Sequence, residues 1–172
     1  MMKVALPLAS LLILMNFMVI NAGTSFDAQW TRTCEGPGKS ISGITSFHSN
    51  HHEDRSWSFQ CRHNRKITPS CVWSGWVNSY DNELLFQCPY KGVISGVHSK
   101  HNNHHEDRLF DFLCCSTKAK WLSNCRWTGY VNTWDGSMNY VVPWNYVLVG
   151  AKSHHNNRRE DRIWQYRVCE LV

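Results

Sequence analysis

One motif occurs three times along this chain, and it limits the possible folds more than any other feature. The tripeptide Glu-Asp-Arg recurs at 53–55, 106–108 and 160–162, so successive copies are 53 and 54 residues apart. With each Asp as position zero, the copies share Gly at −11, His at −6, Asn at −4 and aromatic residues at +3 and +5. Such self-similarity indicates a repeat architecture in which neighbouring units complete one shared core.

The local pattern of each copy is that of β-structure. Residues 55–59 alternate between large or charged and small or polar side chains, the period-two pattern of a half-buried strand. A strand is expected before each motif, and the glycine in it indicates a bulge or a close backbone approach. These preceding strands are expected at 41–47, 93–97 and 146–151.

A second segment, Cys-x-Trp-x-Gly-[Trp/Tyr]-Val-Asn, occurs only twice, at 71–78 and 125–132. No window shows sustained helical periodicity. The sequence therefore predicts an all-β single domain of three pseudo-symmetric repeats of short antiparallel strands, β-prism-like or alternatively β-trefoil-like. The approximate repeats are 28–70, 71–124 and 125–172.

The N-terminus predicts secretion. Lys3 precedes an almost wholly apolar run over 4–20, and small residues follow at Ala22 and Gly23. This pattern is typical of a signal peptide over 1–22, which leaves a mature domain over 23–172. A membrane anchor is the alternative, but the run is at the lower limit for a span and no basic flank follows.

Composition narrows the function classes. The formal net charge is only +5 and is not gathered into a stripe, which disfavours a nucleic-acid binder. Eight cysteines in a secreted chain predict disulfides. Pairing by matched sequence separation, 27 and 27 then 43 and 44, predicts the bridges Cys34–Cys61, Cys88–Cys115, Cys71–Cys114 and Cys125–Cys169.

The tripled polar loop is the candidate binding site. Each copy places imidazole or guanidinium, carboxamide and carboxylate groups within about eight residues, and such groups suit sugar hydroxyls and anions. Three copies on one molecule would raise avidity without new contacts. The candidate ligand-binding residues are His48, Asn50, His51, His52, Glu53, Arg55, His101, Asn103, His104, His105, Glu106, Arg108, His155, Asn157, Arg158, Arg159, Glu160 and Arg162.

A competing interpretation gives part of the motif a structural role. The Asp and Arg of each copy would form an internal ion pair that holds the loop to its strand, and the following aromatic residues would lie in the core. Metal binding is disfavoured because Arg158 and Arg159 replace the His pair of the other copies, which also predicts a third site of different charge. No catalytic motif is present, so neither an enzyme nor a cofactor is expected.

These residues resemble a known family. The motif Asp-Arg-x-[Trp/Phe]-x-[Phe/Tyr], with Cys114-Cys115 and Cys88-Pro89, is similar to the repeat of the dermatopontin family over essentially the whole mature chain. The resemblance implies a secreted matrix protein of the kind that promotes adhesion and binds collagen, proteoglycans and growth factors. Invertebrate relatives include haemagglutinins, amoebocyte aggregation factors and shell-matrix proteins. The acidic, tyrosine-rich N-terminal arm of vertebrate members is missing here, which favours an invertebrate-type member.

The sequence thus predicts an extracellular adhesion or agglutination protein, in matrix or body fluid, that binds glycans or glycosaminoglycans through three loops. Cell-surface or matrix glycans, proteoglycans and collagen are the expected partners, without nucleic acid and without a membrane span. The alternative is a structural extracellular-matrix or shell-matrix protein that contacts collagen, proteoglycan or mineral. Neither the ligand nor the oligomeric state follows from the sequence.

Overall fold

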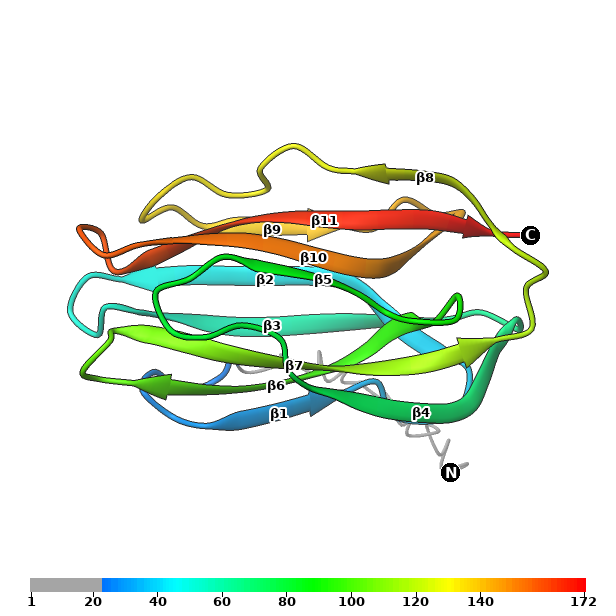
Figure 1. Ribbon diagram of the computed structural model, residues 1–172, viewed down its shortest axis with the longest axis horizontal. Helices are drawn as coiled ribbons and strands as arrows, with labels where there is room; N and C mark the ends of the chain where they lie inside the picture. The colour runs from blue at the N-terminus through cyan, green and yellow to red at the C-terminus, as the bar shows by residue number, and fades with distance from the viewer. Residues whose placement is uncertain (1–22) are drawn as a thin grey trace, which may run out of the picture.

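A computed structural model describes residues 23–172, and the predicted signal peptide lies outside the described residues. This part of the chain is built from β-strands without a helix, which confirms the all-β prediction (Figure 1). Within it, accordingly, no helix has the length and apolar character needed to cross a bilayer. The strands are β1 (Trp30–Thr33), β2 (Lys39–Ser49), β3 (Asp54–His63), β4 (Ile67–Trp76), β5 (Leu84–Gln87), β6 (Val93–Asn102), β7 (Asp107–Thr117), β8 (Leu122–Trp127), β9 (Met138–Val141), β10 (Tyr146–Asn156) and β11 (Asp161–Leu171).

Three long antiparallel hairpins carry the repeated motif: β2–β3, β6–β7 and β10–β11. Their strands are 10 or 11 residues long, and the strands before each motif are longer than the sequence predicted. They are longer because pairing continues up to the His at −6, which lies opposite the motif Arg, as in His48↔Arg55. Each hairpin has a register shift just before its glycine, as the sequence predicted. These shifts fall at Ile41/Gly43, Ile94/Gly96 and Leu148/Gly150.

Each hairpin is extended by a strand from another part of the chain. β9 pairs with β2, β1 with β6, and β5 with β10, and each pairing includes the hairpin's glycine. A Cβ atom at Gly150 would lie 2.6 Å from the backbone oxygen of Phe86 on β5, so only glycine admits the arriving strand there. The repeats are thereby interleaved in sequence rather than stacked as separate units.

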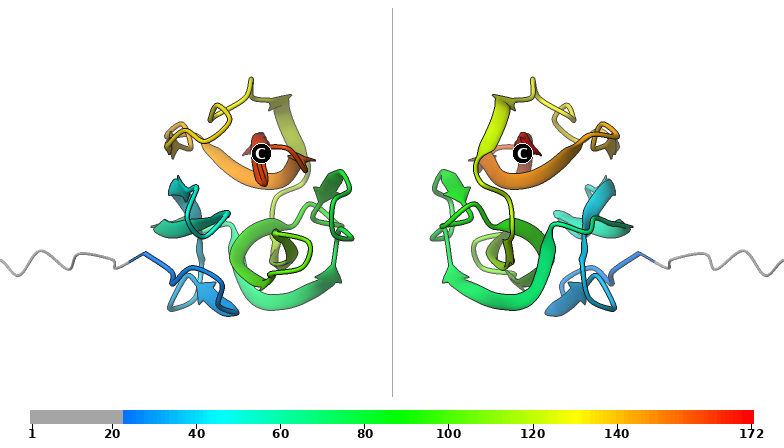
Figure 2. Two further views of the ribbon diagram at one scale, coloured as in Figure 1. Left: turned by 90° about the vertical axis from the view of Figure 1, so that its left-hand side faces the viewer. Right: turned by 90° about the vertical axis from the view of Figure 1, so that its right-hand side faces the viewer.

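The result is three antiparallel sheets, with orders β1-β6-β7-β4, β5-β10-β11-β8 and β3-β2-β9. β4 and β8 include the first residues of the segment that occurs only twice, and in the described residues 23–172 the sheet of the first hairpin has no counterpart of these two strands. Viewed along the long axis of the molecule, the sheets surround a common centre (Figure 2). This arrangement is compatible with the β-prism-like expectation.

The aromatic residues at +3 meet at that centre. Trp57, Phe110 and Trp164 are 2–3% exposed, and their rings contact one another edge to face at centroid distances of 4.8–5.9 Å. Edge-to-face contacts of this kind add to the stabilisation from buried area. The prediction that these positions form the core is confirmed.

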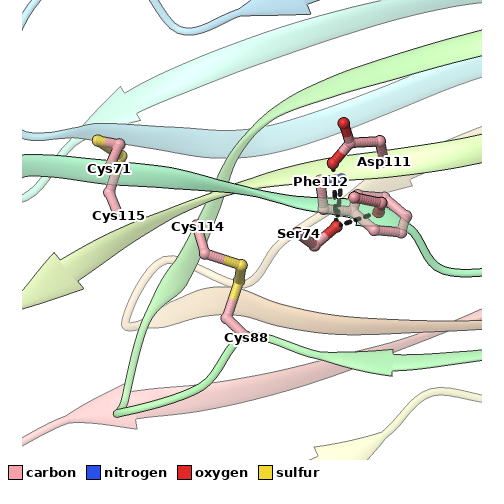
Figure 3. The surroundings of a disulfide bond; sticks show 8 residues. Cys71, Ser74, Cys88, Asp111, Phe112, Cys114 and Cys115 are labelled. Carbon is pink, nitrogen blue, oxygen red and sulfur yellow. Dashed lines mark hydrogen bonds between the residues drawn. A yellow bond between two sulfur atoms is a disulfide. The ribbon is translucent and has the colours of Figure 1, made fainter.

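Two predicted disulfides are present, Cys34–Cys61 and Cys125–Cys169. The other two predictions, Cys71–Cys114 and Cys88–Cys115, are wrong. The bridges are instead Cys71–Cys115 and Cys88–Cys114 (Figure 3).

The exchange follows from strand geometry. Successive side chains of a strand point to opposite faces of the sheet. The adjacent Cys114 and Cys115 on β7 therefore cannot form disulfides on the same face. The register of β4 against β7 places Cys71 directly opposite Cys115. Cys114 then faces the other way, where Cys88 follows β5.

Candidate functional site

The three motif turns lie at the same end of the molecule (Figure 1). Each is a four-residue turn, at 50–53, 103–106 and 157–160, and ends in a glutamate with positive φ of 43–47°. Positive φ is uncommon for a residue other than glycine. We call these turns the tips.

Beneath the tips, the Asp and Arg of the motif form a closed ring of buried ion pairs between repeats. Each guanidinium binds the carboxylate of a different repeat in a bidentate manner, and all six residues are 3–4% exposed. The pairs are Arg55–Asp161 (2.6 and 2.8 Å), Arg162–Asp107 (2.6 and 2.6 Å) and Arg108–Asp54 (2.6 and 2.6 Å). The predicted structural role of these residues agrees with their burial and ion pairing, but the predicted partners are wrong, because each pair joins two repeats rather than a loop to its own strand.

A second set of aspartates supports this ring, and the sequence analysis missed it. Asp27, Asp81 and Asp135, each 54 residues apart, have positive φ and donate their backbone N–H groups to the ring carboxylates at 2.8–2.9 Å. The next residue in the chain accepts a hydrogen bond from a ring arginine through its backbone carbonyl, at 3.0 Å in each case. These residues are Ala28, Asn82 and Gly136. The equal spacing was the signal that could have revealed these residues.

The histidines at −6 are not at the surface. The side chains of His48, His101 and His155 are 0–1% exposed and lie beside the ring carboxylates and the aspartates of the second set. Together with Arg55, Arg108 and Arg162, they are the predicted site residues that the structure places inside the molecule.

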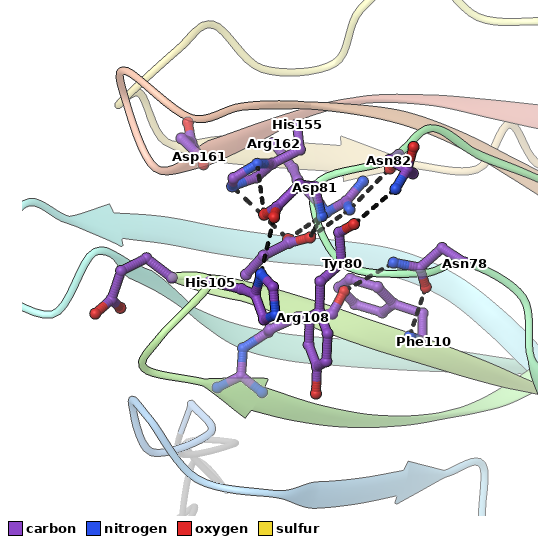
Figure 4. Close-up of polar contacts among 12 residues, drawn as sticks. Asn78, Tyr80, Asp81, Asn82, His105, Arg108, Phe110, His155, Asp161 and Arg162 are labelled. Atoms are coloured by element: carbon purple, nitrogen blue, oxygen red, sulfur yellow. Dashed lines mark hydrogen bonds and ion pairs between the residues drawn. The ribbon is translucent and has the colours of Figure 1, made fainter.

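The residues at −2 are fixed in place at the edge of the tips. His52 stacks on Phe26 and its Nδ1 lies 2.9 Å from Asp27 Oδ2. His105 stacks in the same way on Tyr80 and lies 2.8 Å from Asp81 Oδ2 (Figure 4). In the third repeat Arg159 takes this place and donates to Asp135 Oδ2 at 2.6 Å. These groups are therefore oriented before any ligand arrives.

The outermost side chains of the tips lie at the surface, and the side-chain oxygens of Asn103 and Asn157 also contact Nδ1 of His101 and His155, at 3.2 and 3.3 Å. They are exposed in all three repeats: Asn50, His51, Asn103, His104, Asn157 and Arg158. Between the first and third tips lies a polar cavity of about 430 Å³. It is lined by His48, Asn50, Glu53, Asp135, Asn156, Arg158 and Arg159, so the structure brings predicted residues of two repeats together.

A second cavity, of about 470 Å³, lies at the opposite end of the molecule and was not predicted. Its most prominent member is Trp144, 80% exposed, whose ring covers the guanidinium of Arg62 at 4.7 Å. Arg62 in turn donates to the carbonyls of residues 142–144, which fixes its position. His63 and Lys66 also line this cavity.

Sequence comparisons show the family of the chain. Residues 24–172 match the profile of the dermatopontin family. The chain is 41% identical to the hemagglutinin/amebocyte aggregation factor of Limulus polyphemus, covering 90% of this chain and 94% of that protein. It is 36% identical to dermatopontin of Biomphalaria glabrata (77% and 89% covered) and 24% identical to dermatopontin of Sus scrofa (73% and 71%). No solved structure was found to match. The chain belongs to the dermatopontin family.

Proposed function

We propose that this protein is a secreted, non-enzymatic adhesion or agglutination protein whose three tips bind anionic glycans such as glycosaminoglycans. The observation that carries the proposal is the set of three like-built tips at one end of a disulfide-bonded β-framework. The buried Arg–Asp ring holds the tips rigidly, so little conformational entropy is lost on binding.

The chemistry of the tips suits sulfate and carboxylate groups. Arg158 offers a guanidinium fork that binds such anions in a bidentate manner, and Asn157 beside it offers both donor and acceptor to hydroxyls. The cavity between the first and third tips is large enough for one or two sugar rings. In the first and second tips, His51 and His104 stand where the third tip has Arg158, so the third tip offers the guanidinium fork.

The relatives support agglutination over a purely structural role. The Limulus relative carries hemagglutination and amebocyte aggregation in its name, and it is more similar to this chain than the two dermatopontins compared above. The matrix alternative predicts collagen or mineral binding that sugars do not inhibit. Sugar-inhibitable haemagglutination by the oxidised protein separates the two functions.

Agglutination requires contacts in more than one direction, and all three tips point the same way (Figure 1). We therefore assign the second contact to the cavity at the opposite end, where the exposed ring of Trp144 and the guanidinium of Arg62 form a platform for a sugar face. A single molecule could then bridge two surfaces.

Binding of the oxidised protein to arrayed sulfated glycans tests the proposal. Arg158→Ser should weaken binding about tenfold, the loss expected for one charge-assisted contact. Arg32→Ser removes the same charge from an exposed position on β1 that lines neither cavity, and it should leave binding unchanged. Equal loss in both variants, or no glycan binding by the unmodified protein, would overturn the proposal.

A further inference from the structure

The three tips are built alike but are not equal. In the second and third tips an asparagine at −5 accepts a hydrogen bond from the backbone N–H two residues later, Asn102 from His104 at 2.9 Å and Asn156 from Arg158 at 3.0 Å. Ser49 stands at this position in the first tip, and its shorter side chain forms no such bond within residues 23–172. The first tip therefore lacks a contact that holds the other two.

The imidazole of the first tip also lacks a contact that the other two have. In the second and third tips, Nδ1 of the His at −6 lies 3.2 and 3.3 Å from the amide oxygen of the Asn at −4, and only Nε2 lacks a partner. In the first tip both ring nitrogens of His48 lack a hydrogen-bond partner among the described residues, although the side chain is 1% exposed. Oδ1 of Asp161 lies 3.4 Å from its Nδ1 but is already bound by Arg55. Such buried, unpaired nitrogens cost free energy, which a polar ligand can recover.

The imidazole and the asparagine of the first tip lie in the wall of the cavity of about 430 Å³ between the first and third tips. The third tip contributes two guanidiniums to the same wall, but that of Arg159 is bound to Asp135 at 2.6 Å. Among the described residues of the wall, Arg158 is then the cation and Glu53 the anion without an ion-pair partner, and both are exposed. The cavity thus offers one available charge of each sign, and the charges of its wall cancel when the histidine is neutral.

We propose that this cavity is the tightest glycan subsite of the protein, and that it takes one acidic sugar residue whose single anionic group is flanked by free hydroxyls. Arg158 binds the carboxylate or sulfate through its fork, and Glu53 accepts hydrogen bonds from the neighbouring hydroxyls. Asn50 offers both a donor and an acceptor to the same sugar ring. His48 forms the buried part of the wall, where a hydroxyl, or a water that the sugar retains, satisfies its open Nδ1.

Glycan binding by the tips, as proposed above, is the basis of this inference, which adds a preference that net charge alone does not predict. A formal net charge of +5 favours the most highly sulfated saccharide. In this cavity, however, a second anionic group would lie among the carboxylates of Glu53 and Asp135 without an available cation. A sulfated hydroxyl also can no longer donate to Glu53. A sugar with one anionic group and free hydroxyls therefore fits better than one that is sulfated throughout.

Calorimetry of the full oxidised chain with a hyaluronan tetrasaccharide, which carries carboxylates and free hydroxyls but no sulfate, tests the proposal. We expect one tight equivalent, and about tenfold weaker binding after complete O-sulfation of the same saccharide, the loss expected for one charge-assisted contact. Asn50→Ala should weaken binding of the unsulfated form about fivefold, as for one neutral hydrogen bond. Asn103→Ala, the same change at the exposed counterpart in the second tip, should leave that binding unchanged.

Glu53→Gln provides a second readout, because it removes the negative charge but keeps an acceptor at an exposed position. It should make binding of the sulfated tetrasaccharide at least as tight as that of the unsulfated one, whereas Glu106→Gln in the second repeat should keep the preference. Equal losses in Asn50→Ala and Asn103→Ala, or tighter binding of the sulfated form by the unmodified protein, would overturn this inference and leave the proposed function standing. Absence of binding to every anionic saccharide would overturn both.

Discussion

Removal of one carboxylate from the buried ring should have a large and predictable effect. Asp107→Ala deletes a side chain that is 3% exposed and accepts two hydrogen bonds from Arg162 at 2.6 Å and one from the backbone N–H of Asp81 at 2.9 Å. Arg162 keeps only its bond to the Asn82 carbonyl and remains buried without a counter-charge. Breaking such a pair costs about 3–5 kcal/mol.

Urea unfolding of the oxidised protein, followed by tryptophan fluorescence, measures this loss. Because the ring is repeated, Asp54→Ala and Asp161→Ala should match Asp107→Ala to within about 1 kcal/mol. Glu83→Ala removes a half-exposed carboxylate that lies 3.4 Å from Lys152 and should cost no more than about 0.5 kcal/mol.

The double variant Asp107→Ala/Arg162→Met distinguishes an unpaired charge from simple loss of packing. Removing the guanidinium as well should recover much of the stability, because an apolar pair avoids the desolvation penalty. A single-variant loss below about 1 kcal/mol, or a double variant less stable than Asp107→Ala, would refute the reasoning.

Three further outcomes are expected. Gly150→Ala should destabilise by about 2 kcal/mol in thermal unfolding because its Cβ would meet a backbone oxygen at 2.6 Å, whereas Gly129→Ala, with open space around it, should be near neutral. Burial raises the pKa of Glu160 to about 6, which favours the protonated folded state, so its contribution to stability is fully present below about pH 4.5 and is lost as pH rises through about 6. Glu160→Gln should remove that loss, about 1 kcal/mol, and a variant with unchanged pH dependence would contradict the assignment. Trp144→Ala should abolish haemagglutination but leave retention on a sulfated-glycan column unchanged, and parallel loss of both would show that the far end is not a separate contact.

Much of the fold could be predicted from the sequence because each repeat contains the local pattern of its own hairpin. The alternation over 55–59 and the glycine at −11 determined the hairpins and their bulges. Strand exchange between repeats could not be predicted, because β1, β5 and β9 are only four residues long and have no distinctive pattern. Their placement depends on space at the hairpin glycines, which is a tertiary property.

The disulfide error has a definite source. Matching span lengths ignored the bulge and the side on which each cysteine lies. When the cysteines are aligned on the motif Asp, Cys61 and Cys114 both stand at +7, whereas Cys115 and Cys169 both stand at +8. That alignment gives the observed order and would have been the better guide.

The sequence predicted which residues make up the candidate site but not which of them are buried. Sequence alone placed histidine, arginine and asparagine of each copy in one loop. The structure separates them, since the His at −6 pairs across the hairpin and points inward while the residues at −4 and −3 stay exposed. The ring partners lie 54, 55 and 106 residues apart, so no local pattern could have matched them.

Hydrogen exchange in the presence of a sulfated oligosaccharide tests the central claim most directly. Binding by the tips predicts slowed exchange at 50–53, 103–106 and 157–160, with the largest change around Arg158 and no change along β4 or β8. Protection confined to other strands, with the three tips exchanging as in the free protein, would contradict the account.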